Sequence, residues 1–235
     1  KNNSIGIKIT GGSPRIENNT FYENDTPILL EGPSYPIFSN NLAQNNSVNG
    51  ISVDGSNIIA DTVWQSNLPY IFGSKSIGAG VNLTVKEGTI IKLSEYLIVY
   101  GSLITEGTLA RPVVFTSSAD DEFGGDTNND STSTLATKGS WRQLMFRSSA
   151  TSTLEGVKIR YGGGGCYEGF CWGAINWYEG AAIEIKNSWI EKNLWGIFSN
   201  SGNCQGAFET VKLTNVVFSE NDRKIVIPGN DCSPP

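Results

Sequence analysis

"SPRIENNTFYEND", Ser13 to Asp25, is matched 21 residues later by "SYPIFSNNLAQNN", Ser34 to Asn46. This offset places four residues on like residues: Ile16 on Ile37, Asn19 on Asn40, Phe21 on Leu42 and Asn24 on Asn45. Short alternating segments precede the blocks at similar steps: "IGIKI" from Ile5, "PILLEG" from Pro27 and "GISVDG" from Gly50. One unit of this length cannot bury its own apolar face, so neighbouring units must stack.

The same pattern returns near the C-terminus with a longer step. "AIEIKNSWIEKN" (Ala182 to Asn193) and "TVKLTNVVFSEN" (Thr210 to Asn221) align 28 residues apart, which indicates an inserted loop. Period-2 strands joined by Gly and Asn turns, repeated at one coil's length, predict an all-β parallel β-helix with coils of about 21–28 residues. Asn at equivalent places in successive coils predicts side-chain amide ladders.

Composition excludes several functions. The 235 residues carry 17 Lys and Arg against 23 Asp and Glu, with no His. Without a basic stripe, nucleic acid is not an expected partner. Without His, a Ser-His-Asp triad, a Cys-His dyad and a His-based zinc or iron site are ruled out. The most apolar segment, residues 89–104, is interrupted by Lys92 and Glu95, so membrane insertion is not expected.

The four cysteines allow three disulfide pairings. We favour Cys166 with Cys171 and Cys204 with Cys232, and the alternative is four buried free thiols. Disulfides predict an oxidising compartment outside the cytosol. The chain is expected to be one domain over 1–235, with loop insertions near 119–139 and 162–180, taken from a larger secreted protein with flanking domains.

A family resemblance supports this interpretation. The string "LTVKEGTIIKL…LIVYGSLITEGTLARPVVFTSSADDEFGGDTNND…GSWRQLMF…LEGVKIRYGG" resembles the right-handed parallel β-helix repeat proteins of bacterial and archaeal cell surfaces, in the pectate-lyase-like solenoid superfamily. The Asn-rich opening is similar to related repeats of periplasmic and secreted proteins. The resemblance implies the fold and an extracellular or cell-surface location. It does not imply one activity, because the same solenoid carries lyases, hydrolases, epimerases, adhesins and stalks.

The acidic segment "ADDEFGGDTNNDSTST" (Ala119 to Thr134) is a candidate calcium loop. Asp126, Asn128 and Asp130 alternate as ligands of a hard cation do, and Asp120, Asp121 or Glu122 are further candidate ligands. Ser131 replaces the turn glycine of an EF-hand and no Glu follows at position twelve, so an EF-hand is not expected. The alternative is an unliganded, solvated insertion.

Catalysis and glycan binding remain open at this stage. Lys158 and Arg160 alternate with apolar residues in "VKIRYGG" and are the candidates for a lyase base, although outward charges on a strand are usually only solvated. The segment 166–180 holds five aromatic residues that could stack on sugars or fold inward: Tyr167, Phe170, Trp172, Trp177 and Tyr178.

We therefore expect a non-catalytic extracellular domain for surface adhesion or carbohydrate binding, with a polysaccharide or surface glycan as partner and Ca²⁺ as a possible ligand of the acidic loop. A calcium-dependent polysaccharide lyase or glycoside hydrolase is the first alternative, and a purely structural spacer is the second.

Overall fold

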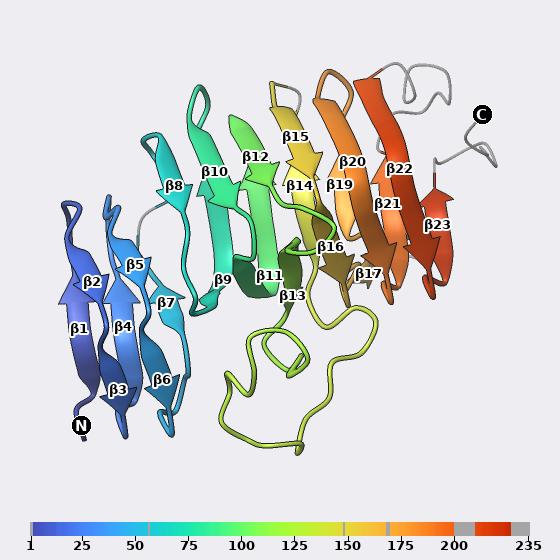
Figure 1. Cartoon of the computed structure of the whole chain (residues 1–235). Helices are drawn as coiled ribbons and strands as arrows, with labels where there is room; N and C mark the ends of the chain where they lie inside the picture. The colour runs from blue at the N-terminus through green and yellow to red at the C-terminus, as the bar shows by residue number, and fades with distance from the viewer. Residues whose placement is uncertain (1, 56, 148, 168–169, 200–209, 227–235) are drawn as a thin grey trace.

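The computed structural model describes residues 2–55, 57–147, 149–167, 170–199 and 210–226, except for the side chains of 166, 167, 170, 171 and 226. The described residues form twenty-three strands. The strands wind into an elongated solenoid whose coils follow one another along its axis (Figure 1). Nearly all pairings are parallel and join successive coils, which gives the body three lateral faces.

The first face is a parallel ladder that runs the length of the described chain. Its members are β1 (Ile5–Ile9), β4 (Thr26–Leu30), β7 (Ile51–Val53), the first part of β9 (Tyr70–Ile77), the first part of β11 (Ile90–Val99), β13 (Val113–Ser117), β16 (Val157–Arg160) and the second parts of β20 (Ala182–Glu191) and β22 (Val211–Ser219).

The second and third faces complete each coil. The second face continues from the later parts of β9 and β11 into β14 (Gln143–Phe146), β19 (Ile175–Trp177), β21 (Trp195–Ser199) and β23 (Arg223–Val226). The third face contains β8 (Thr62–Trp64), β10 (Asn82–Lys86), β12 (Ser102–Glu106), β15 (Thr151–Glu155) and the first parts of β20 and β22.

Three smaller sheets stand apart from this body. In the first coils, β2 (Arg15–Glu17) pairs with β5 (Ile37–Ser39), and β3 (Thr20–Tyr22) pairs with β6 (Leu42–Gln44). An antiparallel hairpin of β17 (Cys166–Tyr167) and β18 (Phe170–Cys171) projects from the second face. No helix among the described residues is long and apolar enough to cross a membrane.

Apolar side chains stack in columns inside the coils. The column of the first face consists of paired residues in consecutive strands: Ile7, Ile28, Ile51, Tyr70, Ile91, Phe115, Ile159, Ile190 and Phe218. The members from Ile28 to Ile190 are at most 1% exposed. Because strand side chains alternate, a period-2 pattern fills such a column from every coil.

The coil spacing in the first repeat differs by one residue from the sequence prediction. β1 pairs with β4 at the expected 21 residues, but Ile16 pairs with Phe38 and Phe21 with Ala43, at 22. A one-residue slip turns a side chain to the opposite face, so Ile37 and Leu42 are about half exposed, at 49% and 48%. The predicted 28-residue register of the last repeat is confirmed by the pairs Ile185 with Leu213 and Ile190 with Phe218.

Amide ladders join the coils, as predicted, with partners set by this register. Asn24 donates from its backbone N and from Nδ2 to Asn46 Oδ1, at 2.8 and 3.0 Å. Asn193 makes the same pair of bonds to Asn221 Oδ1, both at 3.0 Å. Asn46 and Asn193 are fully buried. Each ladder therefore satisfies turn amides that the narrow coil removes from water.

Candidate functional site

An aromatic surface covers the second face of the solenoid. In β11 the alternation turns Leu97 and Val99 inward, so Tyr96 and Ile98 point outward, and Tyr100 follows at the strand's end with 38% of its surface exposed. In the next coil, β14 buries Leu144 and Phe146 and leaves Met145 and Arg147 partly exposed. The register places Met145 beside Ile98.

The loop segments around β19 extend this surface. Trp172 and Tyr178 are partly exposed and line one shallow hollow with Tyr96, Tyr100, Arg142 and Arg147. We call these six residues the aromatic face. The backbone N of Tyr178 donates to Phe146 O at 3.0 Å, which fixes the ring next to β14. The Arg147 guanidinium lies over the Tyr178 ring, with its Cζ 4.3 Å from the ring centre.

The hollow has dimensions suited to an oligosaccharide. It encloses about 390 Å³, and a neighbouring hollow of about 300 Å³ shares Tyr96, Ile98 and Tyr100 with it. Flat aromatic rings held on a rigid sheet offer the apolar surface on which sugar rings stack, and tyrosine adds a hydroxyl group that forms hydrogen bonds. Arg142 Nε lies 2.8 Å from Glu95 Oε2, and the Arg147 guanidinium donates to Met145 Sδ at 3.7 Å and lies over the Tyr178 ring.

Of the five aromatic residues predicted to bind a glycan, two belong to the aromatic face and one lies in the interior. Trp172 and Tyr178 belong to the aromatic face. Trp177 is 1% exposed and pairs with Phe146 in the core of the second face, so it follows the inward-folding alternative. The side chains of Tyr167 and Phe170 lie outside the described residues. Tyr96, Tyr100, Arg142 and Arg147 were not among the sequence candidates.

The acidic loop lies against the first face and is anchored there by Lys92. This side chain has no exposed surface. Its Nζ donates to Asp120 O at 2.9 Å, to Gly125 O at 2.9 Å and to Thr127 Oγ1 at 2.8 Å. Burial lowers the pKa of Lys92 to about 8, and the charges of Asp120, Asp121 and Asp126 oppose that decrease. The loop therefore covers this outward-pointing lysine of the first face.

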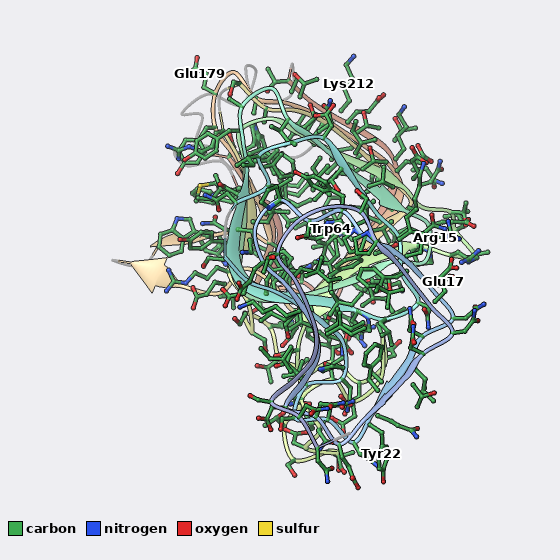
Figure 2. All side chains as sticks on the ribbon, turned by 90° about the vertical axis from the view of Figure 1, so that its left-hand side faces the viewer. Arg15, Glu17, Tyr22, Trp64, Glu179 and Lys212 are labelled. Atoms are coloured by element: carbon green, nitrogen blue, oxygen red, sulfur yellow. The ribbon has the colours of Figure 1, made fainter. Side chains whose placement is uncertain are left out.

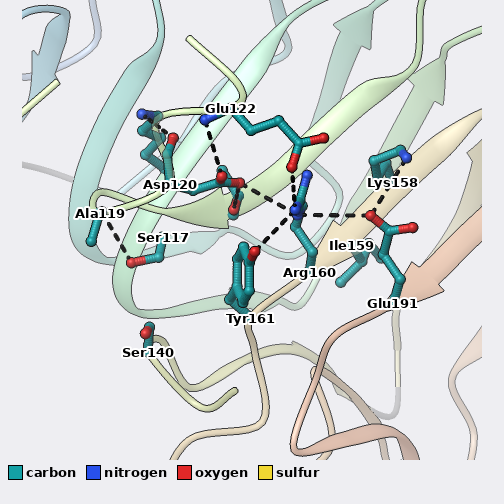
Figure 3. Close-up of polar contacts among 12 residues, drawn as sticks. Ser117, Ala119, Asp120, Glu122, Ser140, Lys158, Ile159, Arg160, Tyr161 and Glu191 are labelled. Carbon is teal, nitrogen blue, oxygen red and sulfur yellow. Dashed lines mark hydrogen bonds and ion pairs between the residues drawn. The ribbon is translucent and has the colours of Figure 1, made fainter. Parts of the chain in front are cut away.

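Arg160 is the second anchor of the loop (Figure 3). Its guanidinium has no exposed surface and donates to Glu122 Oε2 at 2.6 Å and to Tyr161 Oη at 3.0 Å. Asp120 Oδ2 lies 3.5 Å from Nε and Glu191 Oε1 lies 3.7 Å from it. Burial opposes the charge of Arg160, but Glu122 and Asp120 raise its pKa above the ordinary value.

The two candidates for a lyase base, Lys158 and Arg160, are engaged in contacts within the fold. Arg160 is covered by the loop, and the ring of Phe123 lies 5.0 Å from its Cζ. Lys158 Nζ lies 3.5 Å from Glu191 Oε1 and 5.1 Å from the centre of the Trp189 ring. The hydrogen bond from Arg160 also lowers the pKa of Glu122. Through these contacts Arg160 holds the acidic loop against β16.

The predicted calcium ligands are only partly in place for a cation. Asp120 Oδ2 accepts from Thr116 Oγ1, and the two Asp126 carboxylate oxygens accept the backbone amides of Asp130 and Ser131. Three buried oxygens of the loop have no hydrogen-bond donor: Asp121 Oδ1, Asn128 Oδ1 and Asp130 Oδ1. Among the described residues, no three acidic, His or Cys side chains form a group that could hold a metal.

The surroundings of Asp121 also shift its pKa. Burial and the neighbouring charge of Asp126 raise its pKa, with smaller effects from Asp130 and Asp120. A cation placed among these groups would reverse that effect, since positive charge favours the ionised carboxylate. Among the described residues, Asp121, Asn128 and Asp130 each keep a buried oxygen without a donor, whereas the carboxylates of Asp120 and Asp126 accept hydrogen bonds.

The predicted disulfides rest on side chains outside the described set. The backbone pairing is described for one of them: Cys166 and Cys171 are directly opposite in the β17–β18 hairpin. Opposite residues of antiparallel strands have Cα atoms about 4.5–5.5 Å apart, within the range that a disulfide spans. Cys204 and Cys232 lie outside the described residues.

Comparison with known proteins agrees with the solenoid architecture. Residues 1–94 match the family model described as the right handed beta helix region. No curated protein and no solved structure matches the chain.

Proposed function

The chain is a right-handed parallel β-helix repeat protein, and on that premise we propose that it is a non-catalytic, extracellular carbohydrate-binding or adhesion domain. The observation that carries this proposal is the aromatic face. It joins Tyr96 and Tyr100 to Trp172 and Tyr178 across three coils of one rigid sheet. The cysteine usage supports an oxidising, extracellular setting.

The proposed ligand is a polysaccharide. Neighbouring coils of a parallel sheet are about 4.8 Å apart, and β14 lies between β11 and β19, so the rings of Tyr96 and Tyr100 stand about two coils from those of Trp172 and Tyr178 along the axis. Arg147 adds a cation over the Tyr178 ring, which favours a sugar that carries a carboxylate over a neutral one.

Binding of the full chain to immobilised neutral and uronate polysaccharides tests this function. Tyr100→Ala and Trp172→Ala should each weaken binding about tenfold, because each removes a stacking surface. Tyr22→Ala, on β3, is the matched control and should bind as the unchanged chain does. Equal binding by all four proteins would refute the aromatic face as the site, and no binding at all would favour the spacer.

A polysaccharide lyase or hydrolase would release new unsaturated or reducing ends from the same panel. We expect no such product. The two candidate residues for proton abstraction are already engaged, Arg160 beneath the acidic loop and Lys158 with Glu191. Product formation that is lost in Lys158→Met but kept in Lys212→Met would overturn the non-catalytic assignment.

Calcium binding by the acidic loop is a second proposed property, favoured by the three oxygens without donors. Asp121, Asn128 and Asp130 would hold the cation, and its charge would tie the loop together. Calorimetric titration with Ca²⁺ should show one site that Asp130→Asn weakens and that the exposed Asp25→Asn leaves unchanged. At a hundredfold excess over Kd the ion would stabilise the fold by about 2.7 kcal/mol. Absence of heat and of any thermal shift would contradict the site.

A further inference from the structure

A large hollow lies on another flank, where the first coils meet the rest. It encloses about 1070 Å³, the upper end of the range for ligand sites. Residues of five strands line it, in the order β2, β5, β8, β10 and β12. Viewed along the solenoid axis, Arg15 and Glu17 point outward from this flank and Trp64 lies inside the coil (Figure 2).

This hollow exists because β5 and β8 do not pair. After β7 the chain passes through Ile58, which pairs with Ile77 in the second face, before it reaches β8. The strands remain joined only beyond their ends, where Asn67 accepts from the backbone N of Asn41 at 3.1 Å and donates to Asn41 O at 2.5 Å. Within the described chain, β5 pairs only with β2, and β8 only with β10.

The free side of β5 offers backbone hydrogen-bonding groups to the hollow. Ile37 N donates to Pro14 O and Ser39 O accepts from Asn18 N, so Ile37 and Ser39 direct their amide groups toward β2. Alternate residues of a parallel ladder direct theirs to opposite sides, and Phe38 therefore presents its N–H and C=O to the hollow. An unpaired edge of this kind is a template for another strand.

Two buried hydroxyl groups at the hollow have no hydrogen-bond partner. They are Tyr35 Oη and Thr62 Oγ1, and Thr62 is only 7% exposed. A buried hydroxyl without a partner destabilises the fold, and a bound polar group would relieve that cost. Both residues line the hollow, so a ligand seated there would lie close to these two hydroxyls.

The charged groups of the hollow are already satisfied. Glu17 accepts from Arg15 at 2.5 Å and from Ser39 at 2.9 Å. Asp61 accepts from the backbone N and from Nδ2 of Asn82 at 2.8 and 3.1 Å. The other lining residues are uncharged and include Ile37 and Val63, which are 49% and 50% exposed. A neutral ligand with alternating apolar groups and backbone-like amides fits this lining.

We propose that the hollow binds an extended, uncharged polypeptide segment, which adds as a strand to the free edge of β5. Its main chain would pair with Phe38, its apolar side chains would cover Ile37 and Val63, and its polar atoms would meet Tyr35 Oη and Thr62 Oγ1. Strand addition obtains affinity from main-chain bonds and specificity from alternate side chains. This site is separate from the aromatic face.

Selection of random seven-residue peptides on the full chain tests the proposal. A selected peptide should slow amide exchange at Phe38 and Val63. Methylation of its alternate backbone nitrogens should weaken binding tenfold or more, because N-methyl groups remove donors to β5. The double variant Tyr35→Phe, Thr62→Val should bind about tenfold more weakly without a lower thermal midpoint, since it removes hydroxyls that are unsatisfied in the free protein.

Three results would overturn the proposal: no selected peptide slows exchange at these amides, N-methylation has no effect, or a neutral oligosaccharide slows their exchange and the peptides do not. Trp172→Ala should keep full peptide affinity. Failure of the aromatic face as a glycan site would therefore leave this result unaffected.

Discussion

At the residue scale, Lys92 combines complete burial with three hydrogen bonds to the acidic loop. Without it, two loop carbonyls and the Thr127 hydroxyl would lose a donor. The residue therefore holds residues 119–127 on the first face while keeping an ammonium group away from water. Such a group is stable there only because its environment consists of oxygen atoms.

The titration of Lys92 gives a testable pH dependence. Its pKa is about 8 in the folded chain and about 10.4 when unfolded, so between these values the unfolded state binds more protons. The free energy of unfolding should therefore rise from pH 8 to pH 10 by up to about 3 kcal/mol from this group. Urea unfolding across that pH range measures it.

Lys92→Met should lack this rise. It should also be less stable near neutral pH, since loop carbonyls lose their donor. The exposed Lys212→Met serves as the control and should reproduce the curve of the unchanged chain. An identical pH dependence in Lys92→Met and in the unchanged chain would contradict the burial of this ammonium group.

At the element scale, the turns between strands are held by the asparagine ladders. Asn46 Nδ2 donates to Phe21 O and to Gln44 O, both at 3.1 Å, and Oδ1 accepts two bonds from Asn24. One side chain thus serves backbone groups of two coils. The repeated asparagines are structural elements of the coil.

Asn46→Ala should lower the free energy of unfolding by about 2–4 kcal/mol, because it leaves several buried polar groups without partners. Gln44→Ala, at an exposed position at the end of β6, should change it by less than about 0.5 kcal/mol. Denaturant unfolding of both variants provides the comparison. Similar losses in the two variants would show that the ladder adds no stability.

The sequence predicted the elements better than their exact register. Period-2 apolar residues identified the strands and their stacking. The offset of 21 could not reveal one extra residue between β4 and β5, and this residue turns Phe38 inward instead of Ile37. Of the six residues of the aromatic face, the sequence indicated two, Trp172 and Tyr178. Trp172 and Tyr178 lie in an unusual segment, whereas Tyr96 and Tyr100 lie in an ordinary alternating strand whose neighbour, β14, comes from across the 119–139 insertion.

At the scale of the whole molecule, the first coils form a unit with few connections to the rest. β7 continues into β9 through only two residue pairs, Ile51 with Tyr70 and Ser52 with Ile71. The Asn41–Asn67 bonds are a further connection, and the acidic loop adds another, since Asn49 N donates to Thr127 O at 2.8 Å and Asn49 Nδ2 to Asp126 O at 2.9 Å. Solenoid stability is a sum of such neighbour contacts.

Hydrogen exchange should therefore show two levels of protection. Amides of β1 and β4 should open with a lower free energy than those of β11 and β13. Asn49→Ala should lower protection in β1 and β4 by about 1–3 kcal/mol and leave β11 unchanged. Uniform protection along the chain, or an equal effect of Asn49→Ala on both groups of strands, would contradict a separable N-terminal unit.

The acidic loop has a mechanical consequence. Lys92 holds its root and Asn49 holds its far side, so the loop bridges the same junction as the β7–β9 pairs. A pull directed along the solenoid would load the loop in parallel with the strand pairs, so the junction would rupture only when the loop contacts gave way as well. The insertion would act as a brace, raising the force that the N-terminal coils withstand before they peel from the body.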